Sequence, residues 1–453
     1  MPIINYDDKV NELKMEDIVY HGSKVDNYNY LEINWQILYG CNYKCSYCFG
    51  QDILKNDFTS IEKLKKAVDK IFRIKKEYYS FTLLGGEVTY HPDFLELVKY
   101  IYSFDAKISI LLISNASKSI DYFDKLLSYV GNNEFSMNFS VHFEYADLNH
   151  IKELIKLFNK YKYTINVNFM LHPDYKEKIY NFFDELIEMK KEYFFNFGIT
   201  ELREPPDFSR IDSRYDKDFF TWIDSARKTI YNVKSNAVPF QKRHMLFPCS
   251  YFTKKTNDLT ENISINHNLA LRNNLKQFQG FYCCGGENLL RIESNGSYKG
   301  AVCRQFPIVG NIYEDEDIDL YKLSEYVKCN ILQCGCSSND RCNKYKNEKE
   351  AKKYVLNYRK KYPELMMEYL LNTIEELKKD INSNNKNNVD DVNKNLTNIN
   401  NRVNDVNKNL TNVNNKVNSI DNKFNNKIDK LIDTLAWWIP FKKKRDEFRN
   451  KFK

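Results

Sequence analysis

The stretch LEINWQILYGCNYKCSYCFG, residues 31–50, joins an apolar, strand-like run to a loop that contains three cysteines. The cysteines have the spacing CxxxCxxC and are Cys41, Cys45 and Cys48. Thiolates clustered this tightly, in a chain that shows no secretory signal, are expected to bind a soft metal rather than to form disulfides. A cubane iron–sulfur cluster normally takes four cysteines, so three local ligands leave one iron open for a small molecule.

In its spacing and in the aromatic Tyr47 before the third cysteine, the loop resembles the signature of the radical S-adenosylmethionine (SAM) enzymes. The resemblance implies a [4Fe-4S] cluster on Cys41, Cys45 and Cys48, with SAM on the fourth iron and Tyr47 as one of the residues that contact SAM. It also implies that one electron cleaves SAM to methionine and a 5′-deoxyadenosyl radical, which abstracts a substrate hydrogen. The alternative is a structural zinc site or three incidental buried thiols, although zinc loops usually pair a CxxC with a second CxxC or an HxxxH.

After the cysteines, short runs rich in Val, Ile, Phe and Tyr alternate with amphipathic helical runs. Strands are predicted at about 78–84, 107–113, 134–143, 163–171 and 193–200. Helical periodicity occurs between them, for example at Ile61–Phe72, Phe94–Tyr102, Leu148–Tyr161 and Glu177–Lys190. With the first strand these make six βα units, which imply parallel strands and right-handed crossovers. Since a closed barrel needs eight units, the predicted fold class is α/β, a partial (βα)6 TIM-like barrel, which is also the core that the resemblance implies.

The second strand of this predicted barrel ends in Gly85-Gly86-Glu87. Two glycines let the backbone approach a ligand closely, and the carboxylate can accept a cationic group. The motif resembles the GGE motif of the family, which implies that it receives the amino group of SAM. By position the resemblance extends to further SAM contacts, namely Ser114, Asn115, Ser140 and His142 for ribose and carboxylate, and Gly198, Ile199 and Thr200 for adenine.

The other eight cysteines fall in one block, at Cys249, Cys283, Cys284, Cys303, Cys329, Cys334, Cys336 and Cys342. An Asn-Gly turn at residues 295–296 predicts a β-hairpin whose open end brings Cys284 and Cys303 together. This block resembles the SPASM or twitch extension of radical SAM enzymes, which implies auxiliary iron–sulfur ligation by Cys284, Cys303, Cys334, Cys336 and Cys342. The family has CxxCxxxxxC where this chain has Cys334-Gly335-Cys336 and then Cys342, so one auxiliary cluster is expected. The alternative is a zinc-binding structural domain.

A fourteen-residue repeat, DVNKNLTNINNRVN followed by DVNKNLTNVNNKVN, occupies residues 391–418. Its apolar residues are spaced three and four apart, which predicts a coiled coil. Because β-branched residues take the d positions (Val392, Ile399, Val406, Val413 and Ile420), we expect a parallel homotrimer. The last thirteen residues carry a net charge of +5 beside an aromatic cluster, which suits peripheral contact with a membrane or a solvated basic terminus.

The remaining net charge is small, since the whole chain carries +7, so nucleic-acid binding is not expected. The chain has no run of ~20 apolar residues, and its cysteines suit a reducing compartment, so we expect a cytoplasmic enzyme, with the inner membrane face as the place of any membrane contact. The predicted segments are an amino-terminal extension (1–30), the partial barrel (31–235), a small Cys-rich α+β extension (236–345), a helical segment (346–380), the coiled coil (381–435) and the tail (436–453).

The resemblance implies a reductant protein such as flavodoxin or ferredoxin, and a peptide as substrate. Two alternatives stay open, namely radical modification of a sugar or cell-surface precursor, and a non-catalytic, metal-bound scaffold whose coiled coil recruits partners. No side chain is singled out by the sequence as the proton donor or acceptor.

Overall fold

The structure is a computed structural model. It describes residues 13–22, 29–48, 50, 57–204, 211–233, 236–237, 249–256, 259–266, 270, 273–335, 338–360 and 389–437, and single residues at 371, 374, 375, 378, 444, 446 and 450. The chain divides into two compact units, Met1–Tyr362 and Pro363–Lys453.

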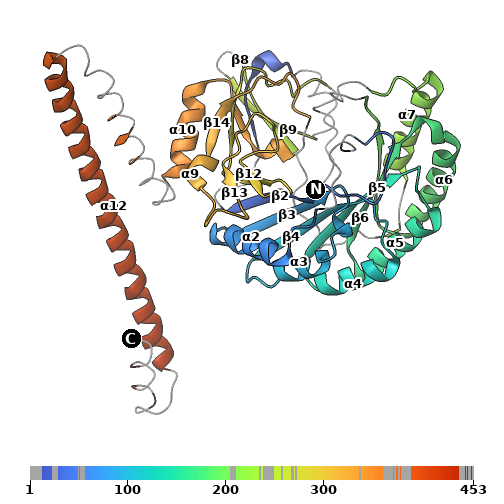
Figure 1. The fold of residues 1–453 in the computed structure, drawn as a ribbon, viewed down its shortest axis with the longest axis horizontal. Coiled ribbons are helices and arrows are strands. Elements are labelled where there is room, and N and C mark those ends of the chain that lie inside the picture. Colours follow the sequence, from blue (N-terminus) through green and yellow to red (C-terminus); the bar gives the residue numbers. More distant parts are fainter. Residues whose placement is uncertain are drawn as a thin grey trace. The chain divides into compact units, whose positions relative to one another are not determined.

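A curved sheet of parallel strands forms the centre of the first unit (Figure 1). Its six βα strands are β2 (Tyr30–Leu38), β3 (Tyr78–Gly85), β4 (Lys107–Ser114), β5 (Glu134–His142), β6 (Thr164–Leu171) and β7 (Asn196–Glu201). Each pairs in parallel with the next, in sequence order. All six strands predicted from the sequence are therefore present, in an arrangement consistent with the partial barrel.

Helices cover the outer face of this sheet (Figure 1). They are α2 (Ile61–Arg73), α3 (Phe94–Ile101), α4 (Ile120–Val130), α5 (Leu148–Tyr161), α6 (Lys176–Glu192) and α7 (Lys217–Asn232). Alternate strand residues such as Trp35, Phe81 and Phe135 are fully buried against them. Side chains of opposite parity face the inside of the curve, because successive residues of a strand point to opposite faces.

A hairpin from the Cys-rich segment extends the same sheet. Strand β11 (Leu289–Ile292) pairs in parallel with β2, and β12 (Ser297–Lys299) and β13 (Gly310–Asn311) continue the sheet beyond it. The turn between β11 and β12 contains Gly296, whose φ of +87° favours glycine. The predicted hairpin is present, and it joins the edge of the parallel sheet.

A second sheet contains six strands in the order β14-β10-β15-β1-β8-β9. They are β1 (Ile18–Gly22), β8 (Cys249–Thr256), β9 (Leu259–Asn266), β10 (Tyr282–Gly285), β14 (Glu325–Lys328) and β15 (Asn343–Tyr345). Strand β1, from the predicted amino-terminal extension, lies between β15 and β8 and completes the sheet of the Cys-rich segment. The short helix α9 (Leu320–Leu323) precedes β14, and α10 (Glu348–Arg359) follows β15 and packs on β10 through Ala351 and Val355.

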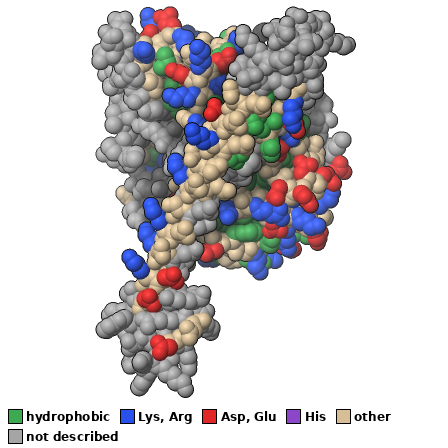
Figure 2. Space-filling view, turned by 90° about the vertical axis from the view of Figure 1, so that its left-hand side faces the viewer, with side chains coloured by type: hydrophobic (Ala, Val, Ile, Leu, Met, Phe, Trp, Pro, Cys, Tyr) green, Lys and Arg blue, Asp and Glu red, His purple; other side chains and the backbone are tan. Residues whose placement is uncertain are grey.

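The second unit contains one long helix, α12 (Val389–Trp437), of 49 residues. It runs without interruption through the fourteen-residue repeat (Figure 1). In Figure 2 most of its visible surface is uncharged, with Lys or Arg side chains placed singly along it and Asp or Glu side chains towards its lower end. The helix agrees with the predicted helical repeat, and its association stays a prediction. None of the described helices combines the length and apolar character needed to cross a membrane. The predicted tail lies almost wholly outside the described residues.

Candidate active site

The three cysteines of the loop after β2 lie on the wall of one cavity. Cys41, Cys45 and Cys48 line this cavity, whose volume is about 480 Å³. A turn presents them, because the amide of Cys48 donates to the carbonyl oxygen of Cys45 at 3.0 Å. Burial, followed by the charges of Glu144 and the other two thiolates, raises the pKa of Cys45 to about 12. Three thiols whose charges oppose one another need a cationic partner to become thiolates together.

This arrangement suits an iron–sulfur cluster better than a single metal ion. Among the residues that the structure describes, no three His, Cys, Asp or Glu side chains form a group that could hold one ion. A cubane cluster does not need such convergence, because each of its cysteines bonds a different iron. The donor set therefore fits the [4Fe-4S] cluster predicted from the spacing, and the cavity beside it offers room for a ligand of the open iron.

Gly85 and Gly86 bring the end of β3 against the cysteine loop. The amide of Gly86 donates to the carbonyl oxygen of Leu38 at 3.1 Å, and the amide of Glu87 donates to that of Gly40 at 2.8 Å. A Cβ atom on Gly86 would lie 2.3 Å from the carbonyl oxygen of Gly40, so the close approach requires glycine. Both glycines also line the cavity. The motif thus supports the cysteine loop as well as forming part of the cavity wall.

The carboxylate of Glu87 is 1% exposed and does not line the cavity. It accepts hydrogen bonds from the hydroxyl of Ser114 at 2.7 Å, from the amide of Asn115 at 2.5 Å, and from the amide and hydroxyl of Thr89. Burial raises the pKa of Glu87, while these hydrogen bonds oppose the rise. Glu87 therefore links the end of β3 to the end of β4 through hydrogen bonds. Its contact with the amino group of SAM stays a prediction.

The other predicted SAM contacts do line the cavity, namely Tyr47, Ser114, Asn115, Ser140, His142 and Thr200, whereas Gly198 and Ile199 do not. The hydroxyl of Tyr47 lies 2.6 Å from Nδ1 of His142, and the two rings stack. Burial lowers the pKa of His142 to about 4, so its ring is neutral at pH 7. The Asn115 carboxamide donates to Asn42 Oδ1 at 3.1 Å. The structure thus brings polar side chains from β4 and β5 and a tyrosine of the cysteine loop to one cavity.

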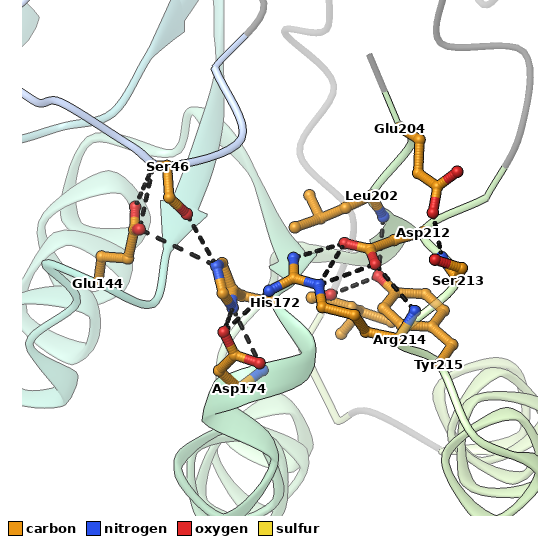
Figure 3. A network of polar contacts seen from close by, with 11 residues as sticks. Ser46, Glu144, His172, Asp174, Leu202, Glu204, Asp212, Ser213, Arg214 and Tyr215 are labelled. Atoms are coloured by element: carbon orange, nitrogen blue, oxygen red, sulfur yellow. Dashed lines mark hydrogen bonds and ion pairs between the residues drawn. The ribbon is translucent and has the colours of Figure 1, made fainter.

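A polar network fastens the cysteine loop to the ends of β5 and β6 (Figure 3). Both carboxylate oxygens of Glu144 accept the amide of Ser46, at 3.0 and 3.1 Å. The Ser46 hydroxyl lies 3.0 Å from Nε2 of His172, whose ring is buried. His172 Nδ1 lies 3.8 Å from the carboxylate of Asp174, which pairs with Arg214 at 2.9 Å. These residues carry no distinctive signal in the sequence, where they are only polar side chains that follow two predicted strands.

Asparagines from three neighbouring strands face the inside of the curved sheet. Asn138, Asn166 and Asn196 are direct partners in register on β5, β6 and β7. The Asn196 amide donates to Asn166 Oδ1 at 2.5 Å, and the Asn166 amide donates to Asn138 Oδ1 at 2.6 Å. Each carboxamide has two donors and an acceptor oxygen, and all three side chains are half-buried. This amide ladder makes the interior polar, whereas barrel interiors are usually filled by branched apolar residues.

The end of β7 adds charged side chains to the cavity wall. Glu201 and Arg203 both line the cavity, next to Thr200 and Leu202. Glu201 also forms an ion pair with Arg227 of α7. These charges lie at the end of strand β7, for which the family resemblance implies only contacts with adenine.

Residues 35–186 match the model of the Radical SAM superfamily. This stretch contains the three cysteines, the Gly-Gly-Glu turn and the ends of β4 and β5. The chain carries a radical SAM domain. Similar curated proteins include an S-adenosylmethionine-dependent nucleotide dehydratase of Fibrobacter sp. (strain UWH6), which is 31% identical over 112 residues, 23% of this chain and 34% of the relative. A GTP 3′,8-cyclase of Microcystis aeruginosa is 30% identical over 92 residues, 19% of this chain and 27% of the relative. The chain thus spans about a third of these relatives or less.

Among solved structures, similar folds include SuiB of Streptococcus suis, with 16% identity, 66% of each chain covered and a TM-score of 0.39. Another is anSMEcpe with bound AdoMet and a Cp18Cys peptide, with 18% identity and a TM-score of 0.39 over 76% of this chain and 99% of that one. These low TM-scores and sequence identities support no conclusion about function.

Outside the radical SAM domain, a second group of cysteines lies beside the second sheet. Cys283 and Cys342 are buried, and Cys303 packs against the same apolar cluster. A hydrogen bond with the Cys342 thiol lowers the pKa of the Cys283 thiol. Cys329 and Cys334 lie close enough for the charge of Cys283 to act on their thiols. The structure therefore gathers five of the cysteines from the Cys-rich block.

Cys284, which the sequence predicts as a ligand, lies on the other face of β10. It packs against Ala351 and Val355 of α10, whereas the preceding Cys283 faces the cysteine group. The two residues are adjacent in the strand, so they point to opposite faces. The structure thus does not bring Cys284 to Cys303, and it supplies Cys283 in its place. Cys336 lies outside the described residues, and so does the side chain of Cys249.

The charge of its surroundings suits this second group to an anionic metal–thiolate centre. Burial by itself would lower the pKa of Lys344, but the thiolates of Cys283, Cys334 and Cys342 and the charge of Asp340 outweigh it and raise that pKa. Sulfur donors of this kind suit iron–sulfur clusters and also zinc. Because no three of the described side chains form a group for a single ion, these cysteines suit a cluster, whose irons each bond a different cysteine, better than one zinc ion.

Proposed function

We propose that this protein is a radical SAM enzyme that reductively cleaves SAM at a [4Fe-4S] cluster held by Cys41, Cys45 and Cys48. The observation that best supports this function is the position of all three cysteines on one cavity wall, together with Gly85 and Gly86, within a radical SAM domain. When bound, the cluster and SAM supply the 5′-deoxyadenosyl radical, which removes a hydrogen atom from the substrate.

The residues around the cavity bind and orient SAM and limit the access of water. Ser140 and Asn115 offer hydrogen bonds to its polar groups, and Tyr47 offers an aromatic face. The neutral ring of His142 holds the Tyr47 hydroxyl in one orientation. Ser46, fastened by Glu144 and His172, keeps the cysteine loop in one conformation.

Anaerobically reconstituted protein should convert SAM to 5′-deoxyadenosine when supplied with dithionite, or with a flavodoxin or ferredoxin as the reductant protein. Cys45→Ala should abolish this conversion. Cys284→Ala is a matched control, because this buried cysteine packs against α10 and does not line the cavity. Zinc in place of iron and sulfide, or cleavage that survives Cys45→Ala, would contradict the proposal and favour the non-catalytic scaffold.

We also propose one auxiliary iron–sulfur cluster in the Cys-rich segment. Cys283, Cys303, Cys334 and Cys342 are our candidate ligands, because the first, second and fourth pack in one apolar cluster. Cys334 lies near enough for the charges of Cys283 and Lys344 to act on its thiol. Cys336 is retained as a further candidate on its sequence position. Iron and sulfide that remain after replacement of Cys41, Cys45 and Cys48 by Ala would support this cluster, and zinc alone would support the structural alternative.

A peptide is our first proposal for the substrate, because the Cys-rich segment resembles an extension whose bearers commonly mature peptides. Radical modification of a sugar-containing precursor is the second proposal. The polar side chains of Ser140, Thr200 and Glu201 on the cavity wall favour it, since hydroxyl and carboxylate groups suit the hydroxyls of a sugar. The matched relatives are named as enzymes of nucleotides. Mass spectrometry of the peptides and small molecules that accumulate when the protein is deleted would decide between the two.

A further inference from the structure

Lys344 lies in a row of buried side chains that crosses the second sheet. It is the direct antiparallel partner of Cys283 on β10 and of His21 on β1. Side chains of direct partners lie on the same face and are near neighbours. The ammonium group of Lys344 is therefore placed on the cysteine side of the sheet, between a cysteine and a histidine.

The contacts of Lys344 fix its ammonium group against the cysteine segment. The Nζ atom donates to the carbonyl oxygens of Asn339 at 2.6 Å and Cys342 at 2.8 Å. It also lies 3.4 Å from Nδ1 of His21 and 5.2 Å from the ring centre of Phe278. The residue is 2% exposed. Its positive charge is thus held away from water, beside the backbone of a proposed cluster ligand.

The buried carboxylate near Lys344 is that of Asp340, and it forms an ion pair with a different lysine, Lys276. Asp340 and Lys276 are both 0% exposed and form an ion pair, and His21 Nε2 lies 3.7 Å from the same carboxylate oxygen. Among the described residues, no carboxylate lies within ion-pair distance of Lys344. The two carbonyl oxygens satisfy hydrogen bonds of the ammonium group but carry no full negative charge. A buried charge without a counter-charge is costly, so an anion on the cysteine side would offset the charge of Lys344.

We propose that Lys344 is the counter-ion of the auxiliary cluster and raises its reduction potential. The inference rests on the proposed auxiliary cluster. Reduction adds one electron, and hence one negative charge, to a centre that is already anionic. A fixed positive charge nearby stabilises the reduced form more than the oxidised form. Lys344 therefore acts as a tuning residue, and its removal should make the cluster harder to reduce.

The test uses the full-length protein with Cys41, Cys45 and Cys48 replaced by Ala, so that only the auxiliary cluster remains. Its midpoint potential is measured by an anaerobic redox titration followed by electron paramagnetic resonance, alongside iron and sulfide content. In this background Lys344→Met should lower the reduction equilibrium constant at least tenfold, which is 59 mV for a one-electron couple. Lys344→Arg, which keeps the charge, should stay close to the parent.

Lys70→Met is the matched control. Lys70 is a buried lysine on α2, a helix that covers the parallel sheet. Its ammonium group donates to the backbone carbonyl oxygen of Ile312 at 2.7 Å. This substitution removes a buried ammonium group without changing the charge beside the cysteines, so the potential should not move.

An unchanged potential in Lys344→Met, with full iron content, would overturn the role of Lys344 and leave the cluster proposal intact. Absence of iron and sulfide from the parent background would instead overturn the cluster proposal, and the role of Lys344 with it. Circular dichroism shows whether Lys344→Met and Lys344→Gln fold. If both fold but lose iron while Lys344→Arg retains it, the result supports the proposal that the cluster needs a positive charge at this position.

Discussion

The guanidinium Nε of Arg341 donates to Oε2 of Glu32 at 2.9 Å. The two side chains are 5% and 7% exposed, so this ion pair is buried. Glu32 belongs to β2, the strand that leads into the cysteine loop, and Arg341 directly precedes Cys342. The pair therefore links the strand that positions the first cysteine group to the segment that carries the second.

Arg341→Met should destabilise the protein strongly, because it leaves the carboxylate of Glu32 buried without its cation. Breaking a buried ion pair from one side typically costs about 3–5 kcal/mol. The expected result is a clear fall in melting temperature of the anaerobically purified protein. Arg73→Met should cost less than about 1 kcal/mol, because Arg73 and Asp317 form an exposed pair, with 59% and 62% of their side chains accessible.

The double variant Glu32→Gln/Arg341→Met removes both charges and should recover part of the lost stability. Equal melting temperatures for the single and double variants would show that packing of the arginine, and not its charge, stabilises this junction.

Gly86→Ala should disrupt the first cluster. The new Cβ would lie 2.3 Å from the carbonyl oxygen of Gly40, which is backbone and cannot move without shifting the cysteine loop. We expect lower iron content at Cys41, Cys45 and Cys48 and a loss of SAM cleavage. Gly335→Ala is the control, because a Cβ there meets no atom within 4 Å. Wild-type iron content and cleavage in Gly86→Ala would show that the loop tolerates the displacement.

Much of the radical SAM domain can be predicted from the sequence because its signals are local. The apolar runs of the six strands, the cysteine spacing and the Gly-Gly-Glu turn each lie within a few neighbouring residues. The contacts of Ser46 with Glu144 and His172 cannot be predicted in this way, because these two residues reach the cysteine loop only when β5 and β6 lie side by side.

The Cys-rich segment shows the same limit more strongly. Its sheet needs β1, which pairs with β15 more than 300 residues later, so no local pattern shows that the amino-terminal segment belongs there. Which of Cys283 and Cys284 faces the other cysteines depends on the register of β10, and a shift of one residue reverses the answer.

Replacement of Cys283 and Cys284 one at a time should show which of the two is a ligand of the auxiliary cluster. In the background that lacks the first three cysteines, Cys283→Ser should reduce iron retention, because its thiol lies with Cys342 and Cys303. Cys284→Ser should retain iron, since that side chain packs against α10. Iron analysis with absorption spectroscopy checks both. Loss of iron only in Cys284→Ser would restore the ligand set predicted from the sequence.

Glu287 should make stability depend on pH above neutrality. Burial raises its pKa to about 8, from an ordinary value near 4.5. Because the pKa is raised on folding, the stabilising contribution is complete below about pH 4.5 and is lost as the pH rises through 8. Glu287→Gln should therefore melt at a higher temperature than the wild type at pH 9, with a smaller difference at pH 6. A difference that is the same at both pH values would contradict the raised pKa.

The long helix α12 should assemble three chains in parallel. At 1.5 Å per residue, its 49 residues form a stalk about 74 Å long. Reading Val403 and Leu410 as position a places the β-branched residues Ile399, Val406 and Val413 at position d, a pattern that disfavours parallel dimers. Val413 is 46% exposed in the single chain, as expected for a seam that needs partners.

Light scattering of the full chain should give the mass of a trimer, and a shortened chain ending near Lys379 should give that of a monomer. Replacing Ile399, Val406 and Val413 together by Leu should shift the full chain towards dimers, since Leu at d suits two strands.

Trimerisation would gather three aromatic and basic tails, residues 436–453, so that weak contacts with an anionic bilayer add together. Vesicle co-sedimentation should then detect the full chain but not a chain ending at residue 435. If full and shortened chains both have the mass of one chain, the stalk does not self-associate and the argument for the tails is lost with it.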